Sequence, residues 1–266
     1  MLGQRHAVDS ADGTSISVVS SGRGSPLLLV HGGMTSSARW APLWPFLTAE
    51  HAVSAMDRRG RGASGDSGSY SLEREFEDVT AVADALARRH GTPVDVFGHS
   101  IGAVCVLGAA AAGAPFRRIA LYEPPGPQTV PHGWVERATA MVAAGQHGRA
   151  MASFLVEVVG LTPATVASLR DSPAAEDSLG IVAATLAREA RALTTVDLDR
   201  LAQRVAPPVL LLLGTESPGW ATDIAHRLAG TLHDAVLVPV DGHGHEGVDT
   251  DPRQVSSHLA AFLAQS

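Results

Sequence analysis

The chain alternates short apolar runs with longer segments in which apolar residues recur every three or four positions. Mostly apolar runs, typical of strands buried in a parallel sheet, occur at 27–30, 53–56, 94–97, 119–122, 209–213 and 235–240. Helical spacing is found at 72–89, 103–112 and 255–263, and an alternating stretch at 15–19 indicates a half-buried strand. This order predicts an α/β fold with a doubly wound, mostly parallel sheet.

One long section, from 126 to about 205, contains helical patterns but no convincing strand. The helical patterns lie at 134–144, 150–159, 163–169 and 181–193, separated by Gly and Pro breaks. A structureless loop of this length is uncommon in a globular domain. We therefore expect a helical lid subdomain at 124–205, inserted into a core formed by 1–123 and 206–266. It should cover the carboxyl ends of the strands, where such sheets bind ligands.

Composition narrows the function further. The 266 residues are 45% hydrophobic and carry a net charge of −7, which argues against nucleic acid or an anionic membrane as the main partner. No Lys occurs in the sequence, which excludes Schiff-base chemistry and pyridoxal phosphate attachment. The single Cys105 permits no internal disulfide. The N-terminus has no apolar stretch suited to a signal peptide, so a cytoplasmic location is expected.

A Gly-x-Ser-x-Gly sequence, Gly98 to Gly102, separates the expected strand at 94–97 from the helix at 103–112. A sharp strand-to-helix turn holds its central residue in a strained conformation with the side chain exposed, and the flanking glycines avoid collisions. Ser100 would then stand above the first turn of the helix, whose free N–H groups favour a developing negative charge. The pattern predicts that Ser100 is a nucleophile.

A serine hydroxyl needs a nearby base, and histidine is the usual one. The best candidates among the 12 His lie after the strand at 235–240, where the chain reads Gly242-His243-Gly244-His245. Closely spaced His with Asp241 is also a pattern of metal ligands, but no further residue extends it with a familiar spacing. We therefore expect neither a metal nor another cofactor.

Four motifs in this order resemble those of the α/β-hydrolase fold superfamily, over nearly the whole chain. They are His31-Gly32-Gly33, Asp57-Arg58-Arg59-Gly60-x-Gly62-x-Ser64, Gly98-His99-Ser100-Ile101-Gly102 and Gly242-His243-Gly244-His245. The late loop of that family usually reads Gly-x-Gly-His, which implies His245 as the base. The resemblance also implies an oxyanion hole made by the backbone N–H groups of Ile101 and Gly33.

Substrate contacts are expected near this oxyanion hole and in the lid. Met34 is the neighbour of Gly33 and should touch the substrate. Trp134, Met141 and Phe154 of the lid either line the substrate pocket or form the lid's own core. We take Trp134 as a substrate-binding candidate.

The acid departs from the family pattern. The family commonly carries an Asp three residues after the Gly that follows the strand at 209–213, and here Ser217 occupies that place. Some relatives, haloalkane dehalogenases among them, carry the acid after the preceding strand, where this chain has Glu123 followed by Pro124. We expect Glu123 to be the acid. Glu216, or a Ser–His dyad without an acid, are the alternatives.

These residues predict a serine-dependent hydrolase that cleaves an ester, thioester or lactone of a small molecule through an acyl-enzyme. A Ser nucleophile disfavours dehalogenation and epoxide opening, which proceed through an alkyl-enzyme. The alternatives are hydrolysis of a carbon–carbon bond, acyl transfer, and a non-hydrolytic biosynthetic step such as cyclisation or dehydration. A ligand receptor without turnover is less consistent with the intact Ser100 and His245. The sequence predicts neither the particular substrate nor the oligomeric state.

Overall fold

A computed structural model describes residues 3–66, 69–164, 166 and 176–265 of the chain. In this part of the chain, eight strands form one sheet in the order β1-β2-β4-β3-β5-β6-β7-β8. The strands are β1 (Gln4–Asp9), β2 (Ser15–Ser21), β3 (Ser25–Val30), β4 (His51–Met56), β5 (Val94–His99), β6 (Phe116–Tyr122), β7 (Val209–Gly214) and β8 (Ala235–Val240). From β4 to β8 neighbouring strands are parallel, and β1 and β2 pair antiparallel at one edge.

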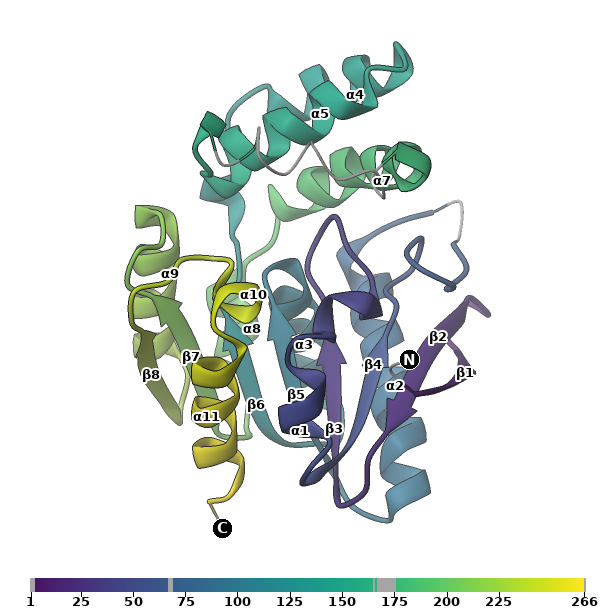
Figure 1. Ribbon diagram of the computed structural model, residues 1–266, viewed down its shortest axis with the longest axis vertical. Coiled ribbons are helices and arrows are strands. Elements are labelled where there is room, and N and C mark those ends of the chain that lie inside the picture. Colours follow the sequence, from purple (N-terminus) through teal and green to yellow (C-terminus); the bar gives the residue numbers. More distant parts are fainter. Residues whose placement is uncertain (1–2, 67–68, 165, 167–175, 266) are drawn as a thin grey trace.

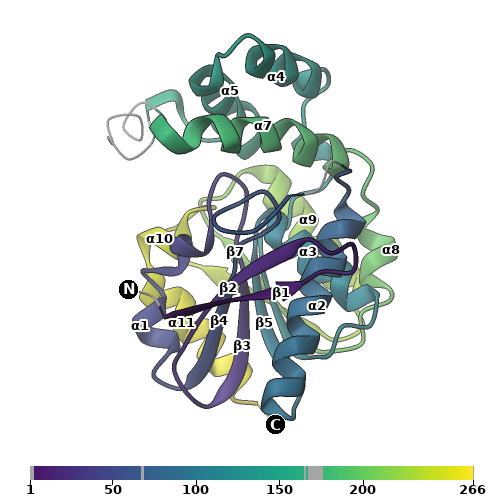
Figure 2. The same ribbon diagram turned by 90° about the vertical axis from the view of Figure 1, so that its right-hand side faces the viewer.

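Helices cover both faces of the sheet, as expected for a doubly wound fold (Figures 1 and 2). One face carries α2 (Leu72–His90), α3 (Ile101–Ala111), α8 (Leu198–Ala202) and α9 (Gly219–Thr231). The other carries η1 (Ser37–Trp40), α1 (Trp44–Leu47) and α11 (Pro252–Leu263), with α10 (Gly247–Thr250) just before it. The predicted α/β architecture is therefore confirmed.

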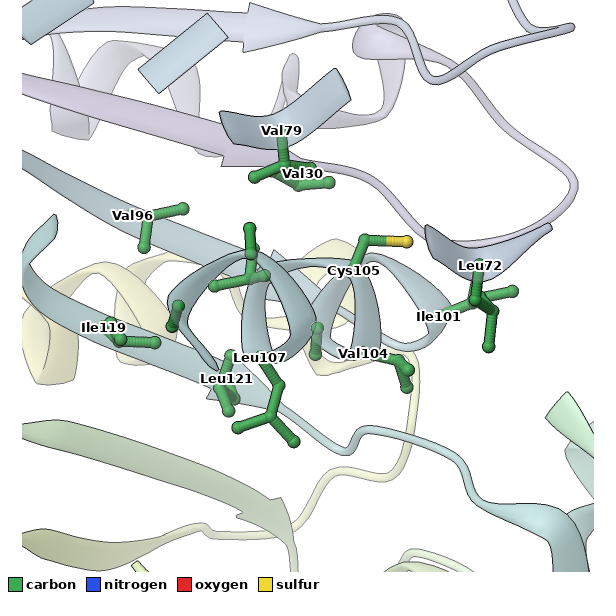
Figure 3. Packing of buried hydrophobic residues seen from close by; sticks show 14 of the residues in the cluster. Val30, Leu72, Val79, Val96, Ile101, Val104, Cys105, Leu107, Ile119 and Leu121 are labelled. Atoms are coloured by element: carbon green, nitrogen blue, oxygen red, sulfur yellow. The ribbon is translucent and has the colours of Figure 1, made fainter. Parts of the chain in front are cut away.

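Helix α3 lies at the centre of the larger core, and each of its 11 residues is buried. Figure 3 shows Leu107 of this helix beside strand residue Leu121. A helix that is apolar on all sides is stable only inside a protein, which explains its run of Ala, Val and Gly. Small residues also let the elements approach: a Cβ added to Gly108 would lie 2.3 Å from the ring of Phe76.

The segment between β6 and β7 is helical. It contains η2 (Pro127–Thr129), α4 (Trp134–Ala143), α5 (His147–Ser153), the π-helical turn η3 (Phe154–Val159) and α7 (Glu176–Leu193). Helices α4, α5 and α7 form a layer above the end of the sheet at which β6 ends (Figures 1 and 2). The helix expected at 163–169 falls mostly outside the described residues.

Candidate active site

Ser100 occupies the sharp turn between β5 and α3. Its backbone has φ 56° and ψ −131°, a conformation that residues other than glycine rarely adopt. A Cβ on Gly98 would lie 2.7 Å from Ala103 Cα, and one on Gly102 would lie 2.4 Å from the carbonyl oxygen of His31. Only glycine fits at both positions, so the two glycines allow the turn that holds Ser100 in its strained conformation.

His245 follows β8 and meets a carboxylate that follows β6. Its Nδ1 lies 2.7 Å from Oε2 of Glu123, and the Glu123 side chain is fully buried. Between the two residues considered for the acid, the structure brings Glu123 to the imidazole, whereas Glu216 is exposed. The carboxylate accepts a hydrogen bond from Nδ1–H, which leaves Nε2 free to act as a proton acceptor.

Glu123 is held in place by the loop after β7. Its Oε1 accepts hydrogen bonds from the backbone N–H of Gly214, at 2.8 Å, and from the hydroxyl of Ser217. Its own N–H donates to the carbonyl oxygen of Leu212, at 3.3 Å. The backbone of Glu123 has φ 46°, the left-handed region that favours glycine. The position that the family usually gives to an acid, Ser217, thus supports the relocated carboxylate.

His99 supports the loop that carries His245. Nε2 of His99 donates to the carbonyl oxygen of His245, at 2.9 Å, and the two rings lie 4.7 Å apart between centroids. Burial, together with the charge of Arg39, lowers the pKa of His99 well below its usual value, so this ring is neutral. His99 lies inside the serine motif, but the motif gives no sign of this role, because the contact with His245 joins residues 146 positions apart.

The loop after β3 is fixed by buried hydrogen bonds. Nδ1 of His31 donates to the carbonyl oxygen of Gly32, at 2.8 Å, and its Nε2 accepts from the backbone N–H of Arg58, at 3.0 Å. Burial and the charge of Arg58 lower the pKa of His31 to about 3. A Cβ on Gly32 would lie 3.0 Å from Ser100 Cβ, so this loop passes directly beside the serine. The next residues, Gly33 and Met34, therefore line the same cavity as Ser100.

The Asp57 motif is a structural support. Oδ1 of Asp57 accepts from the N–H of Ser37, at 2.7 Å, and Oδ2 accepts from the N–H of Ala63, at 3.0 Å. A Cβ on Gly62 would lie 2.3 Å from the Asp57 carboxyl carbon. The motif therefore ties the turn after β4 to the segment after β3, and it does not line the cavity described next.

A cavity of about 850 Å³ joins these groups beneath the helical segment. Ser100, Ile101, Gly33, Met34 and His245 all line it. Its remaining wall is mostly apolar and includes Met151, Phe154, Leu155, Val158, Leu193 and Trp220. A concave, largely apolar site with a few polar groups at one end is typical of a small-molecule site.

Trp134 does not belong to this wall. Its side chain is fully buried, its Nε1 donates to Ser153 Oγ at 2.8 Å, and its ring packs 5.7 Å from that of Phe154. Phe154 lines the cavity, so Trp134 lies behind it. The expectation that Trp134 contacts substrate is corrected: an indole in a small helical layer is needed for that layer's own core.

The two neighbouring histidines, His243 and His245, have different partners. Among the described residues, no three His, Cys, Asp or Glu side chains are grouped so that they could hold a metal ion. His243 instead makes a 2.8 Å hydrogen bond through Nδ1 to Thr250. Within residues 3–66, 69–164, 166 and 176–265, no helix has the length and apolar character needed to cross a membrane.

The sheet, the serine turn and the buried His–Glu pair define a protein built like the α/β hydrolases. Comparison with protein families agrees, because the model of an alpha/beta hydrolase family matches residues 27–258. The chain belongs to this alpha/beta hydrolase family. A search of curated proteins found no match to this chain.

Solved structures with the same fold cover nearly all of the chain. An alpha/beta hydrolase from Sphaerobacter thermophilus DSM 20745 is 34% identical, with a TM-score of 0.86, over 97% of this chain and 100% of that one. The esterase RhEst1 from Rhodococcus sp. ECU1013 is 23% identical, with a TM-score of 0.74 and 98% of each chain covered. The enol-lactonase from Burkholderia xenovorans LB400 is 22% identical, with a TM-score of 0.76, over 98% of this chain and 100% of that one.

Proposed function

We propose that the protein is a serine-dependent hydrolase that cleaves an ester, thioester or lactone of a small molecule. Ser100 is the nucleophile, His245 the general base and Glu123 the acid. The observation that carries the proposal is the 2.7 Å bond between His245 and Glu123 in a cavity that Ser100, at φ 56°, also lines. A strained serine and an oriented imidazole on one cavity wall are what nucleophilic catalysis requires.

The reaction starts with attack of Ser100 Oγ on the substrate carbonyl carbon. Nε2 of His245 takes the serine proton, and the Glu123 carboxylate stabilises the imidazolium that forms. The carbonyl oxygen becomes an oxyanion and accepts hydrogen bonds from the backbone N–H groups of Ile101 and Gly33. The N-terminus of α3 adds its dipole to this stabilisation.

Collapse of the tetrahedral intermediate breaks the bond to the leaving oxygen or sulfur, which receives the proton from His245. The acyl group stays on Ser100 as an ester. Water then attacks this ester with His245 again acting as base, and release of the acid restores the serine hydroxyl. Met34 lies beside the acyl group in this arrangement, and the apolar wall from Met151 to Val158 holds the rest of the substrate.

The esterase and enol-lactonase structures support a reaction of this kind, because both share the fold over nearly the full chain. Their sequences are only 23% and 22% identical to this chain, so the substrate of this protein has to be inferred from its own cavity. No observation in the cavity favours carbon–carbon cleavage, cyclisation or dehydration over acyl hydrolysis.

Covalent labelling with a fluorophosphonate probe tests the nucleophile. We expect the wild-type protein to be labelled and to hydrolyse p-nitrophenyl butyrate. Ser100→Ala should lose the label and several orders of magnitude in turnover, because a triad without its nucleophile retains little activity. Ser257→Ala, at an exposed serine of α11, is the matched control and should behave like wild type. Labelling of Ser100→Ala at the wild-type level would refute the assignment.

A further inference from the structure

A cluster of buried charges lies between the helical segment and the core. Arg58 and Glu75 are both fully buried, with Nη2 of the arginine 2.5 Å from Oε1 of the glutamate. Glu189 of α7 joins them: its Oε1 lies 2.7 Å from Arg61 Nη2 and 3.5 Å from Arg58 Nη2. Its side chain is only 4% exposed. Burying four charged groups is costly unless they are paired, and here two cations face two anions.

Glu189 differs from the other members of this cluster because it also lines the active-site cavity. The hydrogen bond and ion pairs described for Glu189 use Oε1. Its other oxygen, Oε2, lies 3.7 Å from the position that a Cβ on Gly33 would take, with Phe154 and Leu186 equally near. Oε2 is therefore turned toward the loop that we propose as one half of the oxyanion hole.

The distance to this loop limits what Oε2 can contact. Two bond lengths separate a Cβ position from the backbone N of its own residue, so Oε2 lies within about 7 Å of Gly33 N. A carbonyl oxygen that accepts a hydrogen bond from this N–H lies about 3 Å from Gly33 N. A group that donates a hydrogen bond to Oε2 lies about 3 Å from that oxygen. One small substrate can therefore span both points if its donor lies a few bonds from the scissile carbonyl.

The charge of Glu189 decides which donor fits. Burial alone would raise the pKa of this carboxyl, but Arg61 and Arg58 lower it overall, so the group is ionised and only accepts hydrogen bonds. Its charge is already balanced by the two arginines. An added ammonium group would leave a net positive charge in a largely apolar cavity, whereas a neutral hydroxyl adds a donor without a charge.

We propose that Oε2 of Glu189 is a specificity-determining acceptor for a hydroxyl on the acyl part of the substrate. The preferred substrates are 2- or 3-hydroxyacyl esters, or lactones that carry such a hydroxyl. This inference rests on the proposed function and names its substrate class. A substrate without the hydroxyl leaves a buried carboxylate oxygen unpaired, and sites built around such a group reject the analogue that lacks it.

The test compares methyl hexanoate with its 2- and 3-hydroxy and 2- and 3-methoxy derivatives, each as the separate enantiomers. A hydroxyl donates and accepts, whereas a methoxy group only accepts. Acid release is followed with a pH indicator. For wild type, we expect kcat/KM of one hydroxy ester to exceed that of its methoxy and unsubstituted counterparts by about tenfold or more. No preference for the hydroxyl at either position overturns the inference.

Glu189→Gln tests the acceptor without changing its shape. With its amide oxygen held by Arg61, its NH₂ group faces the cavity and donates. The ratio of kcat/KM for the preferred hydroxy ester to that for its methoxy counterpart should then fall by about tenfold, because only the methoxy ester gains a partner. An unchanged ratio overturns the inference. If the variant does not fold, as judged by circular dichroism, the wild-type comparison decides alone.

Glu75→Gln is the matched control. It removes a carboxylate from the same cluster, yet Glu75 does not line the cavity. Its hydroxy-to-methoxy ratio should stay within about twofold of wild type. An equal fall in both variants would mean that the cluster only supports the fold, which overturns the inference.

The parent substrate separates this inference from the proposed function. Hydrolysis of methyl hexanoate by wild type and not by Ser100→Ala supports the proposed function, and an unchanged ratio then rejects the role of Glu189 alone. Ester hydrolysis that persists in Ser100→Ala rejects the proposed function, and the inference falls with it.

Discussion

Replacing Glu123 by Gln tests the acid with almost no change in shape. The carboxylate has three partners: Gly214 N–H and the Ser217 hydroxyl at Oε1, and His245 Nδ1 at Oε2. A glutamine has one oxygen and one NH₂ group, so it cannot accept from both sides. Two donors converge on the Oε1 side, so the amide oxygen should remain there. The NH₂ group then faces Nδ1 of His245, which must give up its proton.

The consequence is a change of tautomer. His245 then carries its proton on Nε2, where it can no longer accept the proton of Ser100. Turning the amide around would keep the productive tautomer, but it leaves the Gly214 N–H facing another donor at a cost of about 1–3 kcal/mol. That cost alone reduces the productive fraction by roughly 5- to 150-fold, and the lost charge no longer stabilises the imidazolium. We expect kcat to fall by roughly 10²- to 10⁴-fold.

Steady-state hydrolysis of p-nitrophenyl butyrate measures this loss, and circular dichroism shows whether the variant is folded. KM should change little, because Glu123 does not line the cavity. The control is Glu216→Gln at the exposed carboxylate of the neighbouring loop, for which we expect less than about tenfold. A folded Glu123→Gln protein within tenfold of wild type would refute the tautomer argument, and the reverse ranking would move the acid to Glu216.

Two further predictions concern the supports of the site. The pKa of His31 is about 3 in the folded protein and near 6.5 when exposed, so its contribution to stability is complete above pH 6.5 and is lost on acidification toward pH 3. By urea denaturation, the free energy of unfolding of the wild type should fall by about 2 kcal/mol between pH 7 and pH 5 because of His31. For His31→Gln, the fall over the same interval should be smaller by about 2 kcal/mol. Equal falls in the two proteins would contradict a neutral buried imidazole. Glu123→Gly should lose activity, and Ser217→Asp in that background should recover at least tenfold in kcat, because the Ser217 side chain contacts the Glu123 carboxylate. No recovery would mean that this loop cannot present an acid to His245.

The sequence predicted the buried strands well and the exposed elements poorly. Apolar runs marked β3 to β7 because both faces of those strands are covered, and β8 was marked by its Val and Leu residues although it lies at the edge of the sheet and is largely unburied. Strand β1 was missed: Gln4–Asp9 is largely exposed and is held by backbone pairing to β2, which leaves no apolar run. Helix α9 was also missed, although Ala221, Ile224, Ala225 and Leu228 share its buried face. Its Gly and Thr residues weakened the helical pattern.

The site was predictable where a local motif carries it, and ambiguous where it depends on pairing between distant strands. Ser100 stands out because its turn needs two glycines within five residues. The sequence favoured Glu123 but left Glu216 and a dyad as alternatives, because the choice depends on which carboxylate faces His245 across the pairing of β6 with β7. The contact of Glu189 with Arg61 joins residues 128 positions apart, and no local pattern reports it.

The way in which Glu123 is held indicates which parts of the sequence can vary without displacing it. Glu123 lies immediately before the helical segment, and the groups that hold its carboxylate, Gly214 and Ser217, lie at and just beyond the end of β7, the strand that follows that segment. Both sides are brought together by the pairing of β6 with β7, in which Tyr122 faces Leu212. The contact between Glu123 and the groups that hold it is therefore assembled by the sheet, at the base of the helical segment. We expect that the cavity-lining residues of α5 and η3 can change to accommodate new substrates, because the positions of Glu123 and its partners are set by the sheet and not by these helices.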